Sequence, residues 1–248
     1  MNTIEIIFSP TGGTEKVAHI IGRQWSESPR LIDLTDPKTD FSACEIHQED
    51  QVLIAMPSFG GRAPAVAIER LKQLAGTGAQ CTLVCVYGNR AHEDTLVEME
   101  DAAKACGFRV VAAIAAVAQH SIIRQYAANR PDASDEQQLI QFAQQIADRT
   151  EAVTRIPGNR PYKKAGGAGL VPKPSKDCVK CDVCAKHCPV QAIDPATLSA
   201  DPKKCISCMR CVTQCPHGAR KVNGAMVSIA ALAIKTACSI RKDNELIL

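Results

Sequence analysis

The strongest constraint on this chain is a cysteine run that occurs twice. The first run is Cys178-x-x-Cys181-x-x-Cys184-x-x-x-Cys188-Pro189, and the second is Cys205-x-x-Cys208-x-x-Cys211-x-x-x-Cys215-Pro216. Each cysteine of the second run lies 27 positions after its counterpart in the first. Eight of the 13 cysteines therefore belong to one duplicated unit, and the fold has to accommodate their thiols at this spacing.

This spacing is the ligand pattern of [4Fe–4S] clusters. The first three cysteines of a run, separated by two residues each, bind one cluster. In a chain with two such runs, the fourth cysteine, which precedes proline, binds the other cluster. The sequence therefore predicts two [4Fe–4S] clusters with crossed ligand sets. One set is Cys178, Cys181, Cys184 and Cys215, and the other is Cys205, Cys208, Cys211 and Cys188.

Other uses of so many cysteines fit the sequence less well. A zinc ribbon has two C-x-x-C pairs without a third cysteine at the same step. A disulfide framework is typical of small secreted chains, and the N-terminus has neither the charged nor the apolar region of a signal peptide. The late apolar stretch 225–240 is too short to span a bilayer and contains Lys235. We therefore expect reduced thiols, a cytoplasmic protein and no membrane span.

Charge and composition divide the chain into two domains. Residues 1–150 carry 13 Lys/Arg and 19 Asp/Glu, a net charge of −6, whereas residues 151–248 carry 16 and 7, a net charge of +9. The segment 155–169 is rich in Pro and Gly and has no apolar period, which is typical of a linker. The predicted parts are a first domain at 1–153, a linker at 154–172, a cluster domain at 173–224 and a helical tail at 225–248. Nucleic acid is not an expected partner, because the lysines surround cysteines instead of alternating with aromatic residues.

The first domain alternates strand-like and helix-like segments. Strands are expected at 3–8, 31–34, 51–56, 80–87 and 108–118, and helices at 13–24, 64–74, 91–106 and from a cap at Ser134 to about 153. Five strands that alternate with helices predict a doubly wound parallel sheet covered on both faces. Ligands bind such sheets at the carboxyl ends of the strands.

The loop after the first strand suits a phosphate group. It reads Ser9-Pro10-Thr11-Gly12-Gly13-Thr14 and enters a helix. Free N–H groups at the helix N-terminus, close backbone approach at the glycines and three hydroxyls can hold a monophosphate by hydrogen bonds. It matches neither a P-loop nor the dinucleotide motif G-x-G-x-x-G. Taken alone, a capped turn without ligand explains the loop equally well.

Two further loops at the same predicted edge place an aromatic residue beside glycine. These loops are Pro57-Ser58-Phe59-Gly60-Gly61-Arg62-Ala63-Pro64 and Tyr87-Gly88-Asn89-Arg90-Ala91-His92. The flat rings of Phe59 and Tyr87 can stack on a planar ligand. The alternative is that both rings only fill the bases of their loops.

Together these motifs resemble a known family. Ser9-x-Thr11-Gly12-x-Thr14 resembles the FMN-phosphate signature of flavodoxins, and the two later loops resemble the flavin-ring loops of that family. With the doubled cysteine run, the chain resembles the flavodoxin–ferredoxin fusion proteins of anaerobic bacteria and archaea. The resemblance implies a flavodoxin-like domain, a small α+β 2[4Fe–4S] ferredoxin-like domain, and FMN as a cofactor beside the clusters. The implied FMN residues are Ser9, Thr11, Gly12, Gly13, Thr14, Pro57, Ser58, Phe59, Gly60, Gly61, Tyr87, Gly88, Asn89, Arg90 and His92.

The expected function is electron transport between FMN and the two clusters and on to a redox partner protein. A flavin takes up one or two electrons and a cluster takes up one, so the pair suits conversion between two-electron and one-electron donors. A partner-docking face or a merely solvated surface is expected at Lys180, Lys186, Lys203, Lys204 and Arg210. The first alternative is a flavin-dependent reductase of a small molecule or quinone, with Arg62, Arg90, His92 or His120 at the substrate. The second alternative is a regulatory module that senses redox state or oxygen.

Two expectations concern the segments outside the domains. The linker is expected to make few fixed contacts, because Gly and Pro favour flexible or extended chain. The stretch 225–240 has apolar residues near helical spacing, which predicts a helix that packs on the protein.

Overall fold

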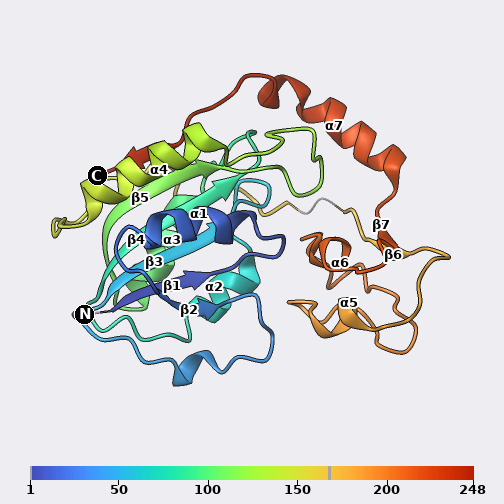
Figure 1. Ribbon diagram of the computed structural model, residues 1–248, viewed down its shortest axis with the longest axis horizontal. Coiled ribbons are helices and arrows are strands. Elements are labelled where there is room, and N and C mark those ends of the chain that lie inside the picture. Colours follow the sequence, from blue (N-terminus) through green and yellow to red (C-terminus); the bar gives the residue numbers. More distant parts are fainter. Residues whose placement is uncertain (1, 167–168) are drawn as a thin grey trace.

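The computed structural model describes residues 2–166 and 169–248 and contains a parallel sheet in its first domain (Figure 1). The parallel strands are β1 (Thr3–Ile7), β2 (Arg30–Asp33), β3 (Gln51–Pro57), β4 (Gln80–Tyr87) and β5 (Arg109–Val117). They pair in the order β2-β1-β3-β4-β5, and every pairing among them is parallel. This is the strand order of flavodoxin-like folds, so the expected fold class is confirmed.

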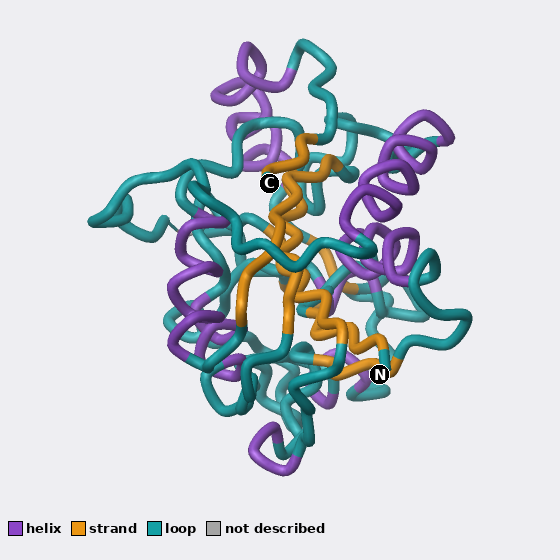
Figure 2. Tube along the Cα trace, turned by 90° about the vertical axis from the view of Figure 1, so that its left-hand side faces the viewer, coloured by secondary structure: helices purple, strands orange, loops and turns teal. Residues whose placement is uncertain are grey.

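Helices cover both faces of the sheet, as Figure 2 shows. The helices of this domain are α1 (Gly13–Gly22), α2 (Ala65–Leu71), α3 (Thr95–Ala105) and α4 (Ala133–Ile146), with a short 3-10 turn at Phe41–Ala43. Alternate strand residues enter opposite layers: Ile4 and Ile6 pack under α2 and α3, and Ile7 packs under α1 and α4. Burial on both faces explains why the central strands β3 and β4 are mostly apolar.

Two helix starts differ from the sequence prediction. α4 is capped by Asp132, whose side chain accepts hydrogen bonds from Ser134 and Asp135, so Ser134 lies inside the first turn. Asp135 completes a reciprocal capping box. α3 begins at Thr95 and not at residue 91. Residues 89 and 93 have positive φ, which is incompatible with helix there.

The C-terminal segment returns to the first domain. α7 (Gly224–Cys238) forms as predicted, but it is followed by β8 (Glu245–Ile247), which pairs antiparallel with β5 as the sixth strand of the sheet. The prediction of a purely helical tail at 225–248 is therefore wrong in its last residues. Three residues are too short a strand to show a period in the sequence, and only pairing with β5 gives them a defined conformation.

Asn244 fastens β8 to the domain. This residue is 4% exposed, and its Oδ1 accepts a hydrogen bond of 2.8 Å from the Val117 backbone. Its Nδ2 donates to Gln138 at 2.8 Å and to Asp135 at 3.3 Å. One side chain therefore satisfies buried polar groups from β5 and α4.

We expect Asn244→Ala to lower the free energy of unfolding of the first domain by about 1–3 kcal/mol, because it leaves the buried Val117 N–H unpaired. Urea denaturation followed by circular dichroism measures this. The control is Glu245→Ala, which changes the exposed neighbour on the same strand. Equal unfolding midpoints for the two variants would show that Asn244 does not fasten the strand.

The segment predicted as a flexible linker makes many fixed contacts. Asp94 accepts hydrogen bonds from the backbone of Asn159 at 2.9 Å and of Lys163 at 2.7 Å. Arg160 pairs with Asp101 at 2.7 Å, and Ile156 is buried in the core. The carboxylates at the start and along the exposed side of α3 thus bind this arm to the first domain, in place of the few contacts expected. Residues 167 and 168 of the predicted linker lie outside the described residues.

The cysteine-rich segment forms a small second unit. It contains a two-stranded antiparallel pairing of β6 (Lys173–Pro174) with β7 (Arg220–Lys221) and the short helices α5 (Val183–Lys186) and α6 (Arg210–Thr213). This α+β unit has the class expected of the cluster domain. Among residues 2–166 and 169–248, no helix has the length and apolar character needed to cross a membrane.

Candidate functional site

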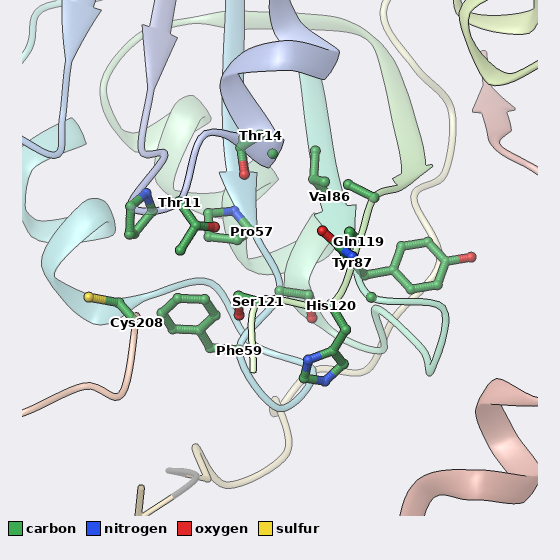
Figure 3. Close-up of a pocket in the computed structure, with 15 residues that line it drawn as sticks. Thr11, Thr14, Pro57, Phe59, Val86, Tyr87, Gln119, His120, Ser121 and Cys208 are labelled. Atoms are coloured by element: carbon green, nitrogen blue, oxygen red, sulfur yellow. The ribbon is translucent and has the colours of Figure 1, made fainter. Parts of the chain in front are cut away.

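A pocket opens at the carboxyl ends of the parallel strands, where the sequence predicts a ligand (Figure 3). Four strand-to-helix loops contribute to it, those after β1, β3, β4 and β5. Eight of the residues implied by the family resemblance line it: Thr11, Gly13, Thr14, Pro57, Ser58, Phe59, Tyr87 and Gly88. The sheet therefore gathers residues from three separate motifs at one edge.

The hydroxyl residues of the loop after β1 differ in whether they line the pocket. Thr11 and Thr14 line the pocket, whereas Ser9 is buried and its Oγ accepts a hydrogen bond of 3.0 Å from the Glu15 N–H. Ser9 thus holds the loop against the start of α1. Gly12 has φ of 87°, a left-handed conformation that glycine adopts without strain and that turns the chain into the helix. These residues fit an anionic phosphate at the helix N-terminus.

The two aromatic residues differ in their relation to the pocket. Phe59 lies on the side of Thr11, and the Tyr87 ring points away from both (Figure 3). Tyr87 is 4% exposed and packs edge-on against His92, with ring centroids 5.4 Å apart. Burial raises the pKa of Tyr87 to about 12. Phe59 is therefore the aromatic side chain placed to contact a planar ligand.

Several implied FMN residues lie outside the pocket lining. Asn89 is 3% exposed and donates to the backbone of Cys238 and Ile240, at 3.0 and 2.8 Å. Arg90 pairs with Glu93 at 2.7 Å. Asn89 thus holds the returning C-terminal segment and Arg90 pairs within its own loop, and neither residue lines the pocket. The remaining residues outside the lining are Ser9, Gly12, Gly60, Gly61 and His92.

The loop after β5 also lines the pocket, through Gln119, His120 and Ser121. The sequence-based prediction placed ligand residues in the loops after the first, third and fourth strands, although the same edge rule applies to the fifth. A Cβ on Gly88 would lie 2.7 Å from the His120 ring, so this close approach requires glycine. Burial lowers the pKa of His120, and its Nδ1 accepts from two backbone N–H groups, which leaves Nε2 as the protonated nitrogen.

The eight cysteines of the duplicated run lie around two cavities. One cavity is lined by Cys178, Cys181, Cys184 and Cys215, and we call these residues the outer group. The other is lined by Cys188, Cys205, Cys208 and Cys211, the inner group. Each group therefore combines three cysteines of one run with the fourth cysteine of the other. No three Cys, His, Asp or Glu side chains of the described residues converge on a point suited to a single metal ion.

The duplication extends to the backbone conformation. Lys180 and Asp182 flank Cys181 with positive φ, and Ser207 and Met209 flank Cys208 in the same way. The Cys188 Sγ accepts a hydrogen bond from the Ala192 N–H at 3.3 Å, and the Cys215 Sγ accepts from Ala219 at 3.2 Å. Left-handed residues beside the cysteines let each loop curl around its cavity. Both groups fit a cubane cluster held by four thiolates.

Burial disfavours the thiolate form at several of these cysteines. It raises the pKa of Cys208 to about 12, and it raises the pKa of Cys184 and Cys211 as well. The guanidinium of Arg220 opposes the effect at Cys184 and Cys211. Metal binding to these thiols therefore releases protons.

The cysteine-rich unit docks on the pocket of the first domain. Cys208 lines this pocket as well as the inner cavity, and Figure 3 shows it on the side of Phe59. Arg210 donates to the backbone oxygens of Ser9 and Pro10, both at 3.4 Å. Arg70 on α2 donates to Pro189 O at 2.6 Å. Two arginines thus connect the two domains.

Comparison with known protein families found a match within the cysteine-rich unit. Residues 199–221 match the family model described as a 4Fe-4S binding domain, and this segment contains the whole second cysteine run. The match identifies a 4Fe–4S segment in the chain. Comparison with curated protein sequences gave no match.

Solved structures similar to the chain include flavodoxins. Oxidised flavodoxin 1 from Bacillus cereus is 17% identical with a TM-score of 0.46, and the alignment covers 61% of this chain and 100% of that one. A flavodoxin from the domain Archaea is 16% identical with a TM-score of 0.42, over 60% and 97%. An azoreductase from Bacillus anthracis is 11% identical with a TM-score of 0.35, over 59% and 97%.

Strand order and the family match together define the architecture. The first domain has the flavodoxin-like order, and the cysteine-rich unit contains the 4Fe–4S segment. The chain is therefore a flavodoxin-like domain fused to a ferredoxin-like domain.

Proposed function

We propose that the chain binds FMN in the pocket of the first domain and two [4Fe–4S] clusters in the cysteine-rich unit, and that it transfers electrons between them. The observation that carries this proposal is the position of Cys208, which lines both the pocket and the inner cavity. A ligand of the inner cluster would then lie beside the flavin. The flavin exchanges electrons in ones or pairs and each cluster exchanges one, so the combination connects two-electron and one-electron partners.

The residues of the chain supply binding, orientation and exclusion of water. Thr11 and Thr14 and the N-terminus of α1 hold the phosphate, and Phe59 contacts the ring. His120 lines the ring side of the pocket as a neutral side chain at pH 7, because burial lowers its pKa. The inner group, with buried Cys188 and Met209, excludes water from the cavity beside the pocket.

The outer group is the proposed exit to a redox partner. Cys181 is exposed, and the neighbouring Val179 is 60% exposed. The exposed lysines Lys180, Lys186, Lys203 and Lys204 supply positive charge around the unit, which favours an acidic partner. Arg210 does not belong to this face, because it connects the two domains. The proposed order is therefore FMN, inner cluster, outer cluster, partner.

Anaerobic purification followed by cofactor analysis tests the proposal. We expect about eight irons, about eight sulfides and one FMN per chain, as two cubane clusters and one flavin require. Rapid-mixing absorbance should then show electron transfer between flavin and clusters at a rate that does not depend on protein concentration. Four irons per chain, or absence of flavin from protein with full cluster content, would contradict it.

The two arginines between the domains should control this internal transfer. We expect the double variant Arg70→Gln/Arg210→Gln to retain both cofactors and to transfer electrons between them at least about tenfold more slowly, because it loses charged hydrogen bonds worth about 1.5–3 kcal/mol each. Stopped-flow absorbance measures the rate. The control is Lys173→Gln, an exposed change in the same unit. A wild-type rate in the fully loaded double variant would show that these bonds do not position the domains for transfer.

A further inference from the structure

The duplication of the cluster unit is broken at one buried position. The residue 27 positions before Arg220 is Ile193. Both lie five residues after the last cysteine of their run and take part in antiparallel pairings, Ile193 with Ala200 and Arg220 with Pro174. They are therefore structural counterparts. Ile193 lines the inner cavity and Arg220 lines the outer one.

Arg220 is a charged residue in an unusual environment. It is 3% exposed, and its Nη1 donates a hydrogen bond of 2.5 Å to Leu198 O. Its Nε and Nη2 are buried and have no hydrogen-bond partner among residues 2–166 and 169–248. A buried charge without its counter-charge costs several kcal/mol, so this guanidinium calls for an anionic group that satisfies it.

A cluster bound in the outer cavity would place negative charge beside Arg220. A [4Fe–4S] cluster with four thiolates carries net negative charge, and its sulfur atoms accept hydrogen bonds from neighbouring N–H groups. Arg220 lines the outer cavity and carries the two unpartnered nitrogens. The outer cavity therefore has a buried cation, whereas the inner cavity has Ile193 at the corresponding position.

We propose that Arg220 neutralises charge at the outer cluster and raises its reduction potential. This inference rests on the proposed function, because it requires the outer of the two proposed clusters. Reduction adds one negative charge to a cluster, and a fixed positive charge nearby stabilises the reduced form more than the oxidised form. Loss of the charge makes the outer cluster harder to reduce.

Spectroelectrochemistry of the purified holoprotein tests the proposal. For Arg220→Ile, which restores the symmetry of the repeat, we expect the equilibrium constant for reduction of the outer cluster to fall at least about tenfold, which is about 59 mV for one electron. Arg220→Lys keeps the charge and should recover most of the difference. Lys221→Gln removes one exposed charge from the same strand and should leave both potentials near the wild-type values.

The controls separate this inference from the proposed function. An iron count of four or fewer in the wild-type protein contradicts the two-cluster proposal and the inference with it. Eight irons with unchanged potentials in Arg220→Ile overturn the inference alone. If Arg220→Ile does not retain its clusters, Arg220→Gln and Arg220→Lys are compared. If the lysine variant alone retains its clusters and has near-normal reduction potentials, the role of charge is supported. If the two variants behave equally, that role is overturned.

Discussion

Cys188→Ser should reduce the iron content from about eight to about four per chain, and the lost cluster should be the inner one. Cys188 belongs to the first cysteine run, yet it lines the cavity of Cys205, Cys208 and Cys211. A serine oxygen is a poor replacement for the soft thiolate that iron–sulfur clusters require. Iron and sulfide analysis, with electron paramagnetic resonance of the reduced protein, measures the loss.

The matched variants for this experiment come from the same chain. Cys215→Ser should remove the outer cluster and leave the inner one, and Cys44→Ser should remove neither, because Cys44 lies in the first domain. Because the inner group lies beside the pocket, Cys188→Ser should also abolish fast electron transfer from flavin. Loss of the outer cluster from Cys188→Ser would contradict the crossed ligand sets.

Gly13→Asp should weaken FMN binding by about 100-fold or more. Gly13 is the first residue of α1 and lines the pocket, so a carboxylate there would face the phosphate. Two unit charges about 4 Å apart interact by about 4 kcal/mol at an effective dielectric constant of about 20. The same carboxylate stabilises the helix itself, because negative charge is favourable at a helix N-terminus. Fluorescence titration of flavin-free protein with FMN measures the affinity.

The control for size is Gly13→Ala. A Cβ at this position would lie 3.6 Å from the Ala118 Cβ, an ordinary contact, so the alanine variant should fold and bind FMN nearly as well as the wild type. Both variants should retain their clusters. Wild-type affinity in Gly13→Asp would place the phosphate elsewhere in the molecule.

Local pattern was enough to predict the parallel strands and most helices of the first domain. The runs that became β1, β3 and β4 are mostly apolar because both faces of the sheet are covered. The carboxyl-edge rule then placed Thr11, Phe59 and Tyr87 at one end of the sheet without any knowledge of side-chain contacts. The same rule was not applied to the loop after β5, and His120 was therefore expected near a ligand only under the reductase alternative.

Local pattern failed where a segment takes its conformation from distant partners. The arm that contains Asn159 and Arg160 has the composition of a linker, but the carboxylates of α3 hold it in place. β8 forms by pairing with β5 and is fastened by Asn244, which accepts a hydrogen bond from Val117, a residue 127 positions away. For the same reason Asn89, which has the sequence environment of a flavin-loop residue, holds the chain near Cys238 instead.

By itself, the sequence determined which groups are predicted to bind cofactors. These groups are eight cysteines at cluster spacing and a hydroxyl-rich phosphate loop, together with the strands that carry the loop. These properties depend on spacing along the chain, which a reader of the sequence sees directly. Only the tertiary structure decided how the two parts meet, because Arg210 and Ser9 are 201 positions apart and come together only through docking. Docking brings Cys208 to the pocket, which is the contact that supports the proposed order of electron transfer, and folding of the cluster unit buries Arg220.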